Sequence, residues 1–121
     1  MSTPSIFKLC AELATIPTPT LSTLLIKKGF RNTHIAGANR MVGEERICGP
    51  AYTIRFIPAR EDLAVPESYG WIDSLPAAID RAPTGSVVVV AADGHPSAGI
   101  VGDIFTTSLK ARGVKGVVSD G

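Results

Sequence analysis

Residues 86–118 read SVVVVAADGHPSAGIVGDIFTTSLKARGVKGVV. The four consecutive valines in this stretch form a β-branched run of strand length, which is typical of a strand buried on both faces. The pattern predicts four successive elements: a strand over Ser86–Ala92, a loop at Asp93–Pro96, a helix over Ile104–Arg112 and a strand over Val114–Val118. A strand, a helix and a strand in this order predict a βαβ unit and therefore an α/β fold.

The residues that precede this unit predict further helices and one strand. Thr3 and Pro4 look like an N-cap and a first-turn proline, and apolar residues recur after them at helical spacing, at Ile6, Leu9, Cys10 and Leu13. A second helix is expected to begin at Thr18-Pro19 and to stop at Gly29. The remaining pattern predicts a strand at Tyr52–Ile57, a loop over 59–70 and a helix over Trp71–Ala82.

Length and composition favour one globular domain, residues 1–121. Apolar residues make up 45% of the chain and charged residues 19%, and the formal net charge is +1 without a basic stripe, so we expect no nucleic-acid partner. No signal peptide and no apolar run of membrane-spanning length is present. Cys10 and Cys48 form no CxxC pair and are expected to be buried free thiols, which predicts a cytoplasmic protein. Since no apolar run is long enough to span a bilayer, we also expect no membrane partner.

The segment DGHPSAGIVGD, residues 93–103, carries the candidate site. It joins a strand to a helix, and ligands of open α/β sheets bind at the carboxyl ends of strands. Gly94, Gly99 and Gly102 allow close approach of the backbone to a ligand, although turn geometry and packing explain the same glycines. The first amides of the helix lack helical partners, so they can hold a small carboxylate.

Other anions fit this segment poorly. Gly94 and Gly99 have the glycine spacing of a phosphate-binding P-loop, but Ile100 and Val101 stand where Lys and Ser or Thr are needed. The chain also has no G-x-G-x-x-G sequence, so a dinucleotide site is unsupported.

Three acids follow or precede elements of the predicted unit. Asp103 falls in the first turn of the helix, where an acid is favoured by the helix dipole alone, or where it could hold a hard cation or its waters. Asp93 and Asp120 each follow a strand, so all three acids could gather at one sheet edge. His34 and His95 are too isolated to predict a zinc site, and Ser97 has no nucleophile elbow or base partner.

The sequence GDIFTTSLKARGVKGVVSDG, residues 102–121, resembles the segment that defines the RraA-like family. That family includes regulators of ribonuclease E activity and class II aldolases that act on 4-hydroxy-4-methyl-2-oxoglutarate and decarboxylate oxaloacetate. Its hallmark is Gly-Asp or Gly-Glu followed at a distance by Arg-Asp, and Gly102-Asp103 matches the first half. CGPAYT at 48–53 and APTGSV at 82–87 also resemble family segments.

The resemblance implies a three-layer β/β/α swivelling domain, incomplete at its C-terminus, assembled as homotrimers or homohexamers. In the aldolases the Asp of the Arg-Asp pair binds Mg²⁺ or Mn²⁺ and the Arg grips the substrate carboxylate. The residue matching Asp103 holds the metal through a water, and amides matching Ile104 and Phe105 bind the substrate carboxylate beside Gly99 and Gly102. The family spacing places the Arg-Asp pair beyond residue 121, so we expect the fold, the direct metal ligand and the substrate arginine to be completed there or by a companion C-terminal chain.

Three functions remain open from the sequence. The first is a lyase, dependent on a divalent metal, that cleaves or decarboxylates a 2-oxo acid to give pyruvate, with Asp103 as the catalytic residue. The second is a regulator without catalytic activity that binds ribonuclease E. The third is a different sugar-acid or hydrolase activity of a two-chain enzyme, because a fold does not fix a function.

Overall fold

The computed structural model of the chain describes residues 5–95 and 99–121. The chain divides into two compact units, Met1–Cys48 and Gly49–Gly121. The predicted N-cap at Thr3-Pro4, and Ser97, lie outside the described residues.

Helix α1 (Ile6–Leu13) opens the first unit and has the boundaries that the apolar spacing predicts. Its N-cap is Ser5, whose side-chain oxygen accepts a hydrogen bond from the amide of Lys8 at 3.3 Å. A serine in this position satisfies an amide that has no partner inside the helix. The cap therefore lies closer to the apolar positions than the predicted Thr3.

Helix α2 (Thr18–Lys27) follows in the same unit. Pro17 is its N-cap and Pro19 falls in the first turn, where a proline costs no helical hydrogen bond; Thr18 is thus already helical. Gly29 has φ +92°, a left-handed conformation that ends the helix as predicted. Among the described residues no single helix has the length and apolar composition to cross a membrane, and only the bent pair α1 and α2, at 117°, passes that test by length and composition.

Cys10 and Cys48 are free thiols, which confirms the prediction of two unpaired cysteines. Cys10 is buried on α1 and Cys48 is half-buried. Burial, and then the neighbouring Cys10 thiol, which is its hydrogen-bond partner, raise the pKa of the Cys48 thiol above its ordinary value. The two cysteines are therefore neighbours in the folded unit, which their sequence spacing does not reveal.

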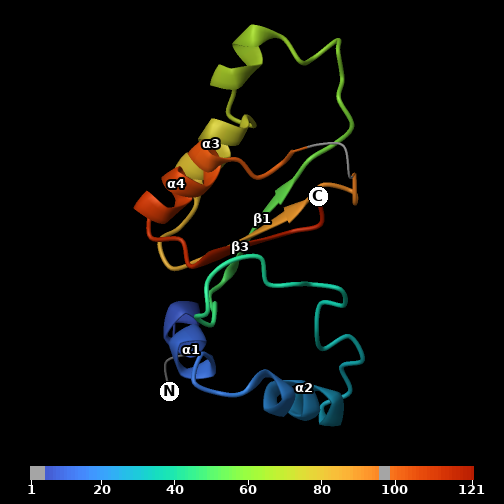
Figure 1. Ribbon diagram of the computed structural model, residues 1–121, viewed down its shortest axis with the longest axis vertical. Helices are drawn as coiled ribbons and strands as arrows, with labels where there is room; N and C mark the ends of the chain where they lie inside the picture. Colours follow the sequence, from blue (N-terminus) through green and yellow to red (C-terminus); the bar gives the residue numbers. More distant parts are fainter. Residues whose placement is uncertain (1–4, 96–98) are drawn as a thin grey trace. The chain divides into compact units, whose positions relative to one another are not determined.

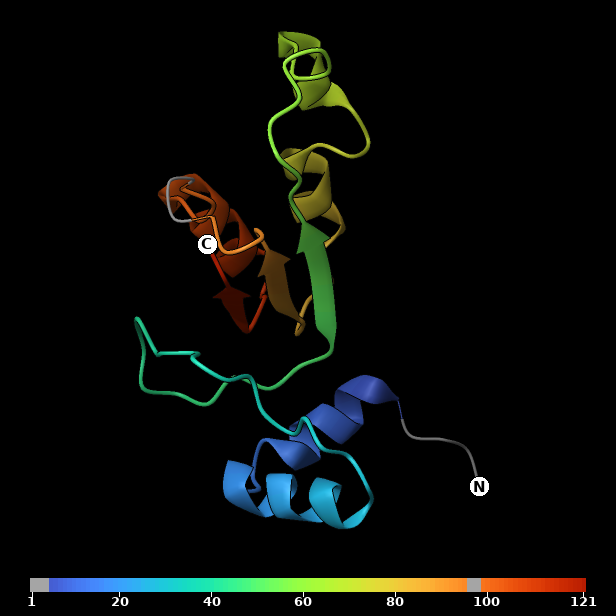
Figure 2. The ribbon, with the colours of Figure 1, turned by 90° about the vertical axis from the view of Figure 1, so that its right-hand side faces the viewer.

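The second unit is built on a parallel sheet in the order β1-β2-β3. The strands are β1 (Ala51–Arg55), β2 (Val87–Ala91) and β3 (Gly116–Ser119), and Figure 2 shows their arrowheads pointing the same way. Tyr52, Val88 and Val117 form one row across the sheet. The valine strand is therefore the central strand, and the predicted α/β class is confirmed.

The connections between these strands contain the helices of the unit. They are the 3-10 helix η1 (Pro66–Gly70) and the helices α3 (Leu75–Arg81) and α4 (Asp103–Ala111). The 3-10 helix lies in the stretch that the sequence predicts as a loop. Helix α3 is shorter than predicted because Ser74 caps it, accepting a hydrogen bond from the Ala77 amide at 3.4 Å, and Pro76 is restricted to the first turn.

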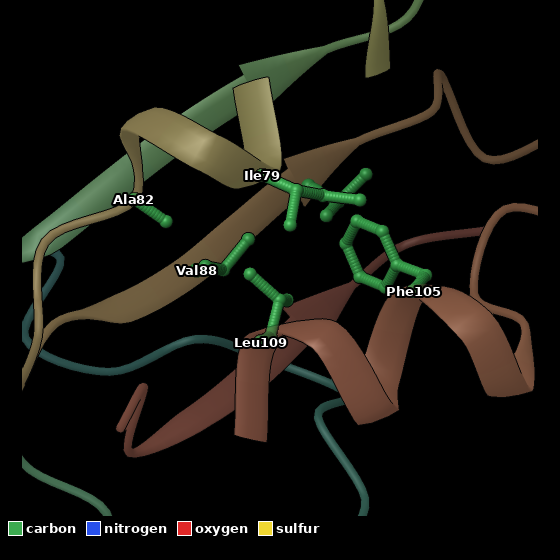
Figure 3. Packing of buried hydrophobic residues seen from close by; sticks show 6 residues of the cluster. Ile79, Ala82, Val88, Phe105 and Leu109 are labelled. Atoms are coloured by element: carbon green, nitrogen blue, oxygen red, sulfur yellow. The ribbon is translucent and has the colours of Figure 1, made fainter. Parts of the chain in front are cut away.

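Helices α3 and α4 lie side by side on one face of the sheet, where the hydrophobic core forms (Figure 1). Figure 3 shows side chains from α3, β2 and α4 pointing toward one another. The core cluster consists of Ile79, Ala82, Val88, Val90, Phe105 and Leu109. Each fully buried side chain of the size of Phe105 or Leu109 contributes about 1.5–3 kcal/mol to folding.

The opposite face of the sheet is less buried. Because strand side chains alternate, Val87, Val89 and Ala91 point away from the face that α3 and α4 cover. Val87 is buried, Val89 is half-buried and Ala91 is exposed, so the predicted burial of this strand on both faces holds only in part. Within the described residues the strands form this one sheet, and the second β layer of the predicted β/β/α arrangement is not among them.

Candidate functional site

The candidate site lies where β2 leads toward α4. The turn after β2 contains two consecutive left-handed residues, Asp93 with φ +60° and Gly94 with φ +63°. A hydrogen bond from the His95 amide to the Ala92 carbonyl, 3.2 Å long, closes this turn. The sharp loop predicted at this place is confirmed over Asp93–His95, and Pro96 lies outside the described residues. Asp93 is the residue for which the conformation is unusual, because side chains rarely tolerate it.

The first turn of α4 contains backbone amides without a helical acceptor. Gly102 is the N-cap and supplies no side-chain hydrogen bond, while its carbonyl accepts from the Thr106 amide at 3.0 Å. Among the described residues the amides of Asp103 and Phe105 have no acceptor. Free amides at the first turn of a helix are donors to anions, as the sequence predicts.

The amide of Ile104 differs from these two. It donates to Oδ1 of Asp103 at 2.8 Å, so the aspartate side chain already occupies one of the predicted carboxylate-binding amides. The other carboxylate oxygen of Asp103 has no hydrogen-bond partner among the described residues, and the side chain is exposed. The Ile104 amide is therefore free to bind an anion only if Asp103 rotates away, whereas the Phe105 amide has no acceptor among the described residues.

The glycines that precede α4 have little packing around them among the described residues, whereas one side chain of the first turn packs in the core. A Cβ added to Gly99 or to Gly102 would meet no heavy atom of the described residues within 4 Å. The Phe105 ring is 4% exposed and packs in the core, whereas the Ile104 side chain is 78% exposed. Phe105 thus anchors the helix start in the core, and its neighbours Asp103 and Ile104 lie at the surface.

Asp120, the third acid considered from the sequence, has a different set of partners. Its carboxylate accepts hydrogen bonds from the Ala92 amide at 2.5 Å and from the Gly94 amide at 3.3 Å. Both oxygens are therefore engaged by the turn after β2. Sequence reasoning placed Asp120 near that turn but missed this role, because hydrogen bonds between residues distant in sequence leave no local signal.

A divalent cation fits this arrangement only through the surroundings of Asp103. In the described part of the chain, no three His, Cys, Asp or Glu side chains are grouped so that they could hold a metal ion. Asp103 is exposed and has one carboxylate oxygen without a hydrogen bond among the described residues, which suits a carboxylate that holds the water of a cation rather than a complete ligand set. That is the role which the resemblance implies for this residue.

Comparisons with known proteins agree with the fold and with the sequence resemblance. The family description "RraA-like: Aldolase/RraA" matches residues 18–121. Two solved structures are similar at 29% sequence identity. One is RraAS2 of Streptomyces coelicolor, described as an unusual member of the RNase ES inhibitor RraA protein family (TM-score 0.80), and the other is an uncharacterized protein from Pseudomonas syringae pv. tomato str. DC3000 (TM-score 0.77).

The two alignments cover a much larger share of this chain than of the solved chains. The alignments cover 94% and 100% of this chain, but only 54% and 50% of the two solved chains, so the chain spans about half the length of these relatives. A search of curated proteins gives no match. The family model matches residues 18–121, and the folds of the two solved structures match that of this chain. This chain therefore belongs to the RraA-like family.

Proposed function

We propose that the chain supplies the substrate-binding part of a lyase, dependent on a divalent cation, that cleaves or decarboxylates a 2-oxo acid to give pyruvate. The RraA-like family includes aldolases as well as inhibitors of ribonucleases, so membership alone does not choose between them. The observation that carries the proposal is the start of α4, where the Phe105 amide, which has no acceptor among the described residues, and the carboxylate of the exposed Asp103 occupy one helical turn.

The substrate carboxylate would bind at this helix start. The Phe105 amide donates to one carboxylate oxygen, and the partial positive charge of the helix N-terminus stabilises the anion. Gly99 and Gly102 leave the approach open, because neither carries a side chain and a Cβ at either position would meet no atom of the described residues within 4 Å. These residues therefore bind and orient the carboxylate.

Asp103 would move the proton. Its exposed position and its unbonded oxygen suit a carboxylate that accepts a proton from a water or a hydroxyl group beside the substrate. Its other oxygen stays on the Ile104 amide, which holds the side chain in place. Mg²⁺ or Mn²⁺, when bound, supplies Lewis-acid stabilisation of the negative charge that develops as the carbon–carbon bond breaks.

We propose this activity for the complete assembly and not for residues 1–121 alone. The solved relatives are about twice as long, and the direct metal ligand and the substrate arginine belong, by the family resemblance, to the sequence beyond residue 121. A homotrimer or homohexamer in the cytoplasm, with or without a companion C-terminal chain, is the corresponding proposal for assembly and location.

Inhibition of a ribonuclease is the second candidate function. The specific observation is the likeness to RraAS2, which is described as belonging to an RNase ES inhibitor family. Such a role needs a protein-binding surface and no turnover, and the near-neutral net charge of +1 suits a regulator that contacts the enzyme and not its RNA.

One experiment separates the two functions. The purified protein, with any polypeptide that accompanies it, is assayed for pyruvate release from oxaloacetate and from 4-hydroxy-4-methyl-2-oxoglutarate, with Mg²⁺ and after EDTA treatment. In parallel, the same preparation is tested for binding to ribonuclease E. Pyruvate release that EDTA abolishes supports the lyase, whereas binding to ribonuclease E without any release supports the regulator and contradicts the lyase.

A further inference from the structure

The carboxylate of Asp120 connects the end of β3 to the turn that follows β2. One oxygen accepts from the Ala92 amide at 2.5 Å and the other from the Gly94 amide at 3.3 Å. A carboxylate is the side chain that suits this pair of donors, because both of its oxygens only accept. An asparagine could accept one of the two bonds, but its NH₂ group would face the other N–H.

The turn that Asp120 binds is closed by the hydrogen bond from the His95 amide to the Ala92 carbonyl, and its residues lie at the surface. Asp93, Gly94 and His95 are all exposed, so hydrophobic packing does not fix their backbone. Asp93 and Gly94 are both left-handed, and this conformation is unfavourable for an aspartate unless its surroundings enforce it. The two hydrogen bonds flank Asp93 on either side and thus fix the residue that bears the strain.

Gly121 extends the same contact toward α4. A Cβ added to Gly121 would lie 2.6 Å from Cβ of Ala92 and 3.2 Å from Cγ1 of Ile100. The backbone at Gly121 therefore packs against both Ala92, which precedes the turn, and Ile100, two residues before the N-cap of α4. Asp120 and Gly121 together therefore contact the chain both at the turn after β2 and at Ile100, just before α4.

We propose that Asp120 is a positioning residue that fixes the Ala92–Gly94 turn and, with Gly121 against Ile100, sets the backbone that presents the carboxylate-binding amide of Phe105. The consequence for ligand binding rests on the function proposed above, whereas the fixing of the turn does not. Asp120 thereby acts through backbone geometry and does not contact the substrate.

Amide hydrogen exchange followed by NMR on the purified protein tests the fixing of the turn. We compare the wild type with Asp120→Ala, Asp120→Asn and the control Asp93→Asn, which removes one carboxylate charge from the same turn and leaves the two hydrogen bonds that Asp120 accepts. In Asp120→Ala the amides of Ala92 and Gly94 should both exchange at least about tenfold faster. In Asp120→Asn only one of the two amides should do so, and Asp93→Asn should change neither.

This pattern distinguishes positioning from a general loss of stability. A general loss would accelerate exchange of the amides in β1 as well, whereas the proposal predicts that they stay protected in Asp120→Asn. If Asp120→Ala does not fold, the isosteric Asp120→Asn decides the matter alone. Equal exchange of Ala92 and Gly94 in Asp120→Asn and the wild type would overturn the proposal.

Titration with pyruvate, followed at the Phe105 amide, tests the consequence for the site. We expect the dissociation constant of pyruvate to rise about tenfold in Asp120→Asn and to stay unchanged in Asp93→Asn. Faster exchange in the turn with unchanged pyruvate affinity would overturn the positioning role. If the complete wild-type assembly does not bind pyruvate, the proposed function fails, and the exchange data still decide whether Asp120 fixes the turn.

Discussion

Gly49 packs its Cα against the backbone of Gly85, so that a Cβ added to Gly49 would overlap the Gly85 carbonyl oxygen and lie 3.2 Å from the carbonyl carbon of Ser86. The two glycines precede β1 and β2, the neighbouring strands that start the sheet in register, with Ala51 beside Val87. The close approach of these backbones needs a residue without a side chain at position 49.

Replacement of Gly49 by alanine should therefore destabilise the fold. The added methyl group meets backbone atoms that cannot move aside without shifting a strand, and we expect a loss of about 1–3 kcal/mol in the free energy of unfolding. Chemical denaturation measures this loss. Gly70→Ala is the matched control because a Cβ there would meet nothing within 4 Å, and equal stability of the two variants would contradict the packing described.

Substitutions on α4 should separate its buried side from its exposed side. Leu109 is 2% exposed, and Leu109→Ala should lower the free energy of unfolding by about 2–5 kcal/mol, because it removes core contacts and leaves a cavity. Ile104 is 78% exposed, and Ile104→Ala should change the stability by less than about 0.5 kcal/mol. Ile104→Ala should also leave pyruvate release unchanged, since only the backbone of this residue is assigned to the site. A large loss in Ile104→Ala would show that this side chain has a partner.

The Cys48 thiol should react slowly with iodoacetamide near pH 7.5. The raised pKa of Cys48 lowers the fraction of thiolate, which is the reactive form, and the rate should increase only as the pH rises above the ordinary range of a thiol. Because the folded-state pKa lies above the unfolded value, the associated stability is complete below the unfolded pKa and is lost as the pH rises through the folded pKa.

The variant Cys10→Ala isolates the contribution of the neighbouring thiol. Burial is the larger cause of the shift, so the pKa of Cys48 should fall only in part and the rate at pH 7.5 should rise modestly. A wild-type Cys48 that reacts as fast as cysteine in an unstructured peptide would contradict this account.

The central part of the fold follows from local sequence patterns. The valine run predicts β2, and the apolar pair Phe105 and Leu109, four residues apart, predicts the buried face of α4. These signals are strong because burial in the core depends on short-range periodicity. The 3-10 helix η1 has no comparable signal, since a five-residue segment without buried residues needs no apolar pattern.

The candidate site is less predictable than the fold around it. The position of Asp103 at the start of a helix follows from the sequence. The hydrogen bond from the Ile104 amide to the Asp103 carboxylate, however, depends on the side-chain rotamer of Asp103. Two other contacts join residues that are far apart in the chain. They are the hydrogen bonds that Asp120 accepts from the Ala92 and Gly94 amides, and the contact between the free thiols of Cys10 and Cys48. Such contacts exist only after the strands and helices have packed.

The role of Asp103 is tested most directly by the rate of pyruvate release from oxaloacetate in the presence of Mg²⁺, compared between the wild type and Asp103→Asn. The amide oxygen of asparagine can still accept from the Ile104 amide, so the helix start is kept while the proton acceptor is lost. We predict a fall of about 100-fold or more, with Asp93→Asn at the wild-type rate. An Asp103→Asn protein that folds and releases pyruvate at the wild-type rate would contradict the account.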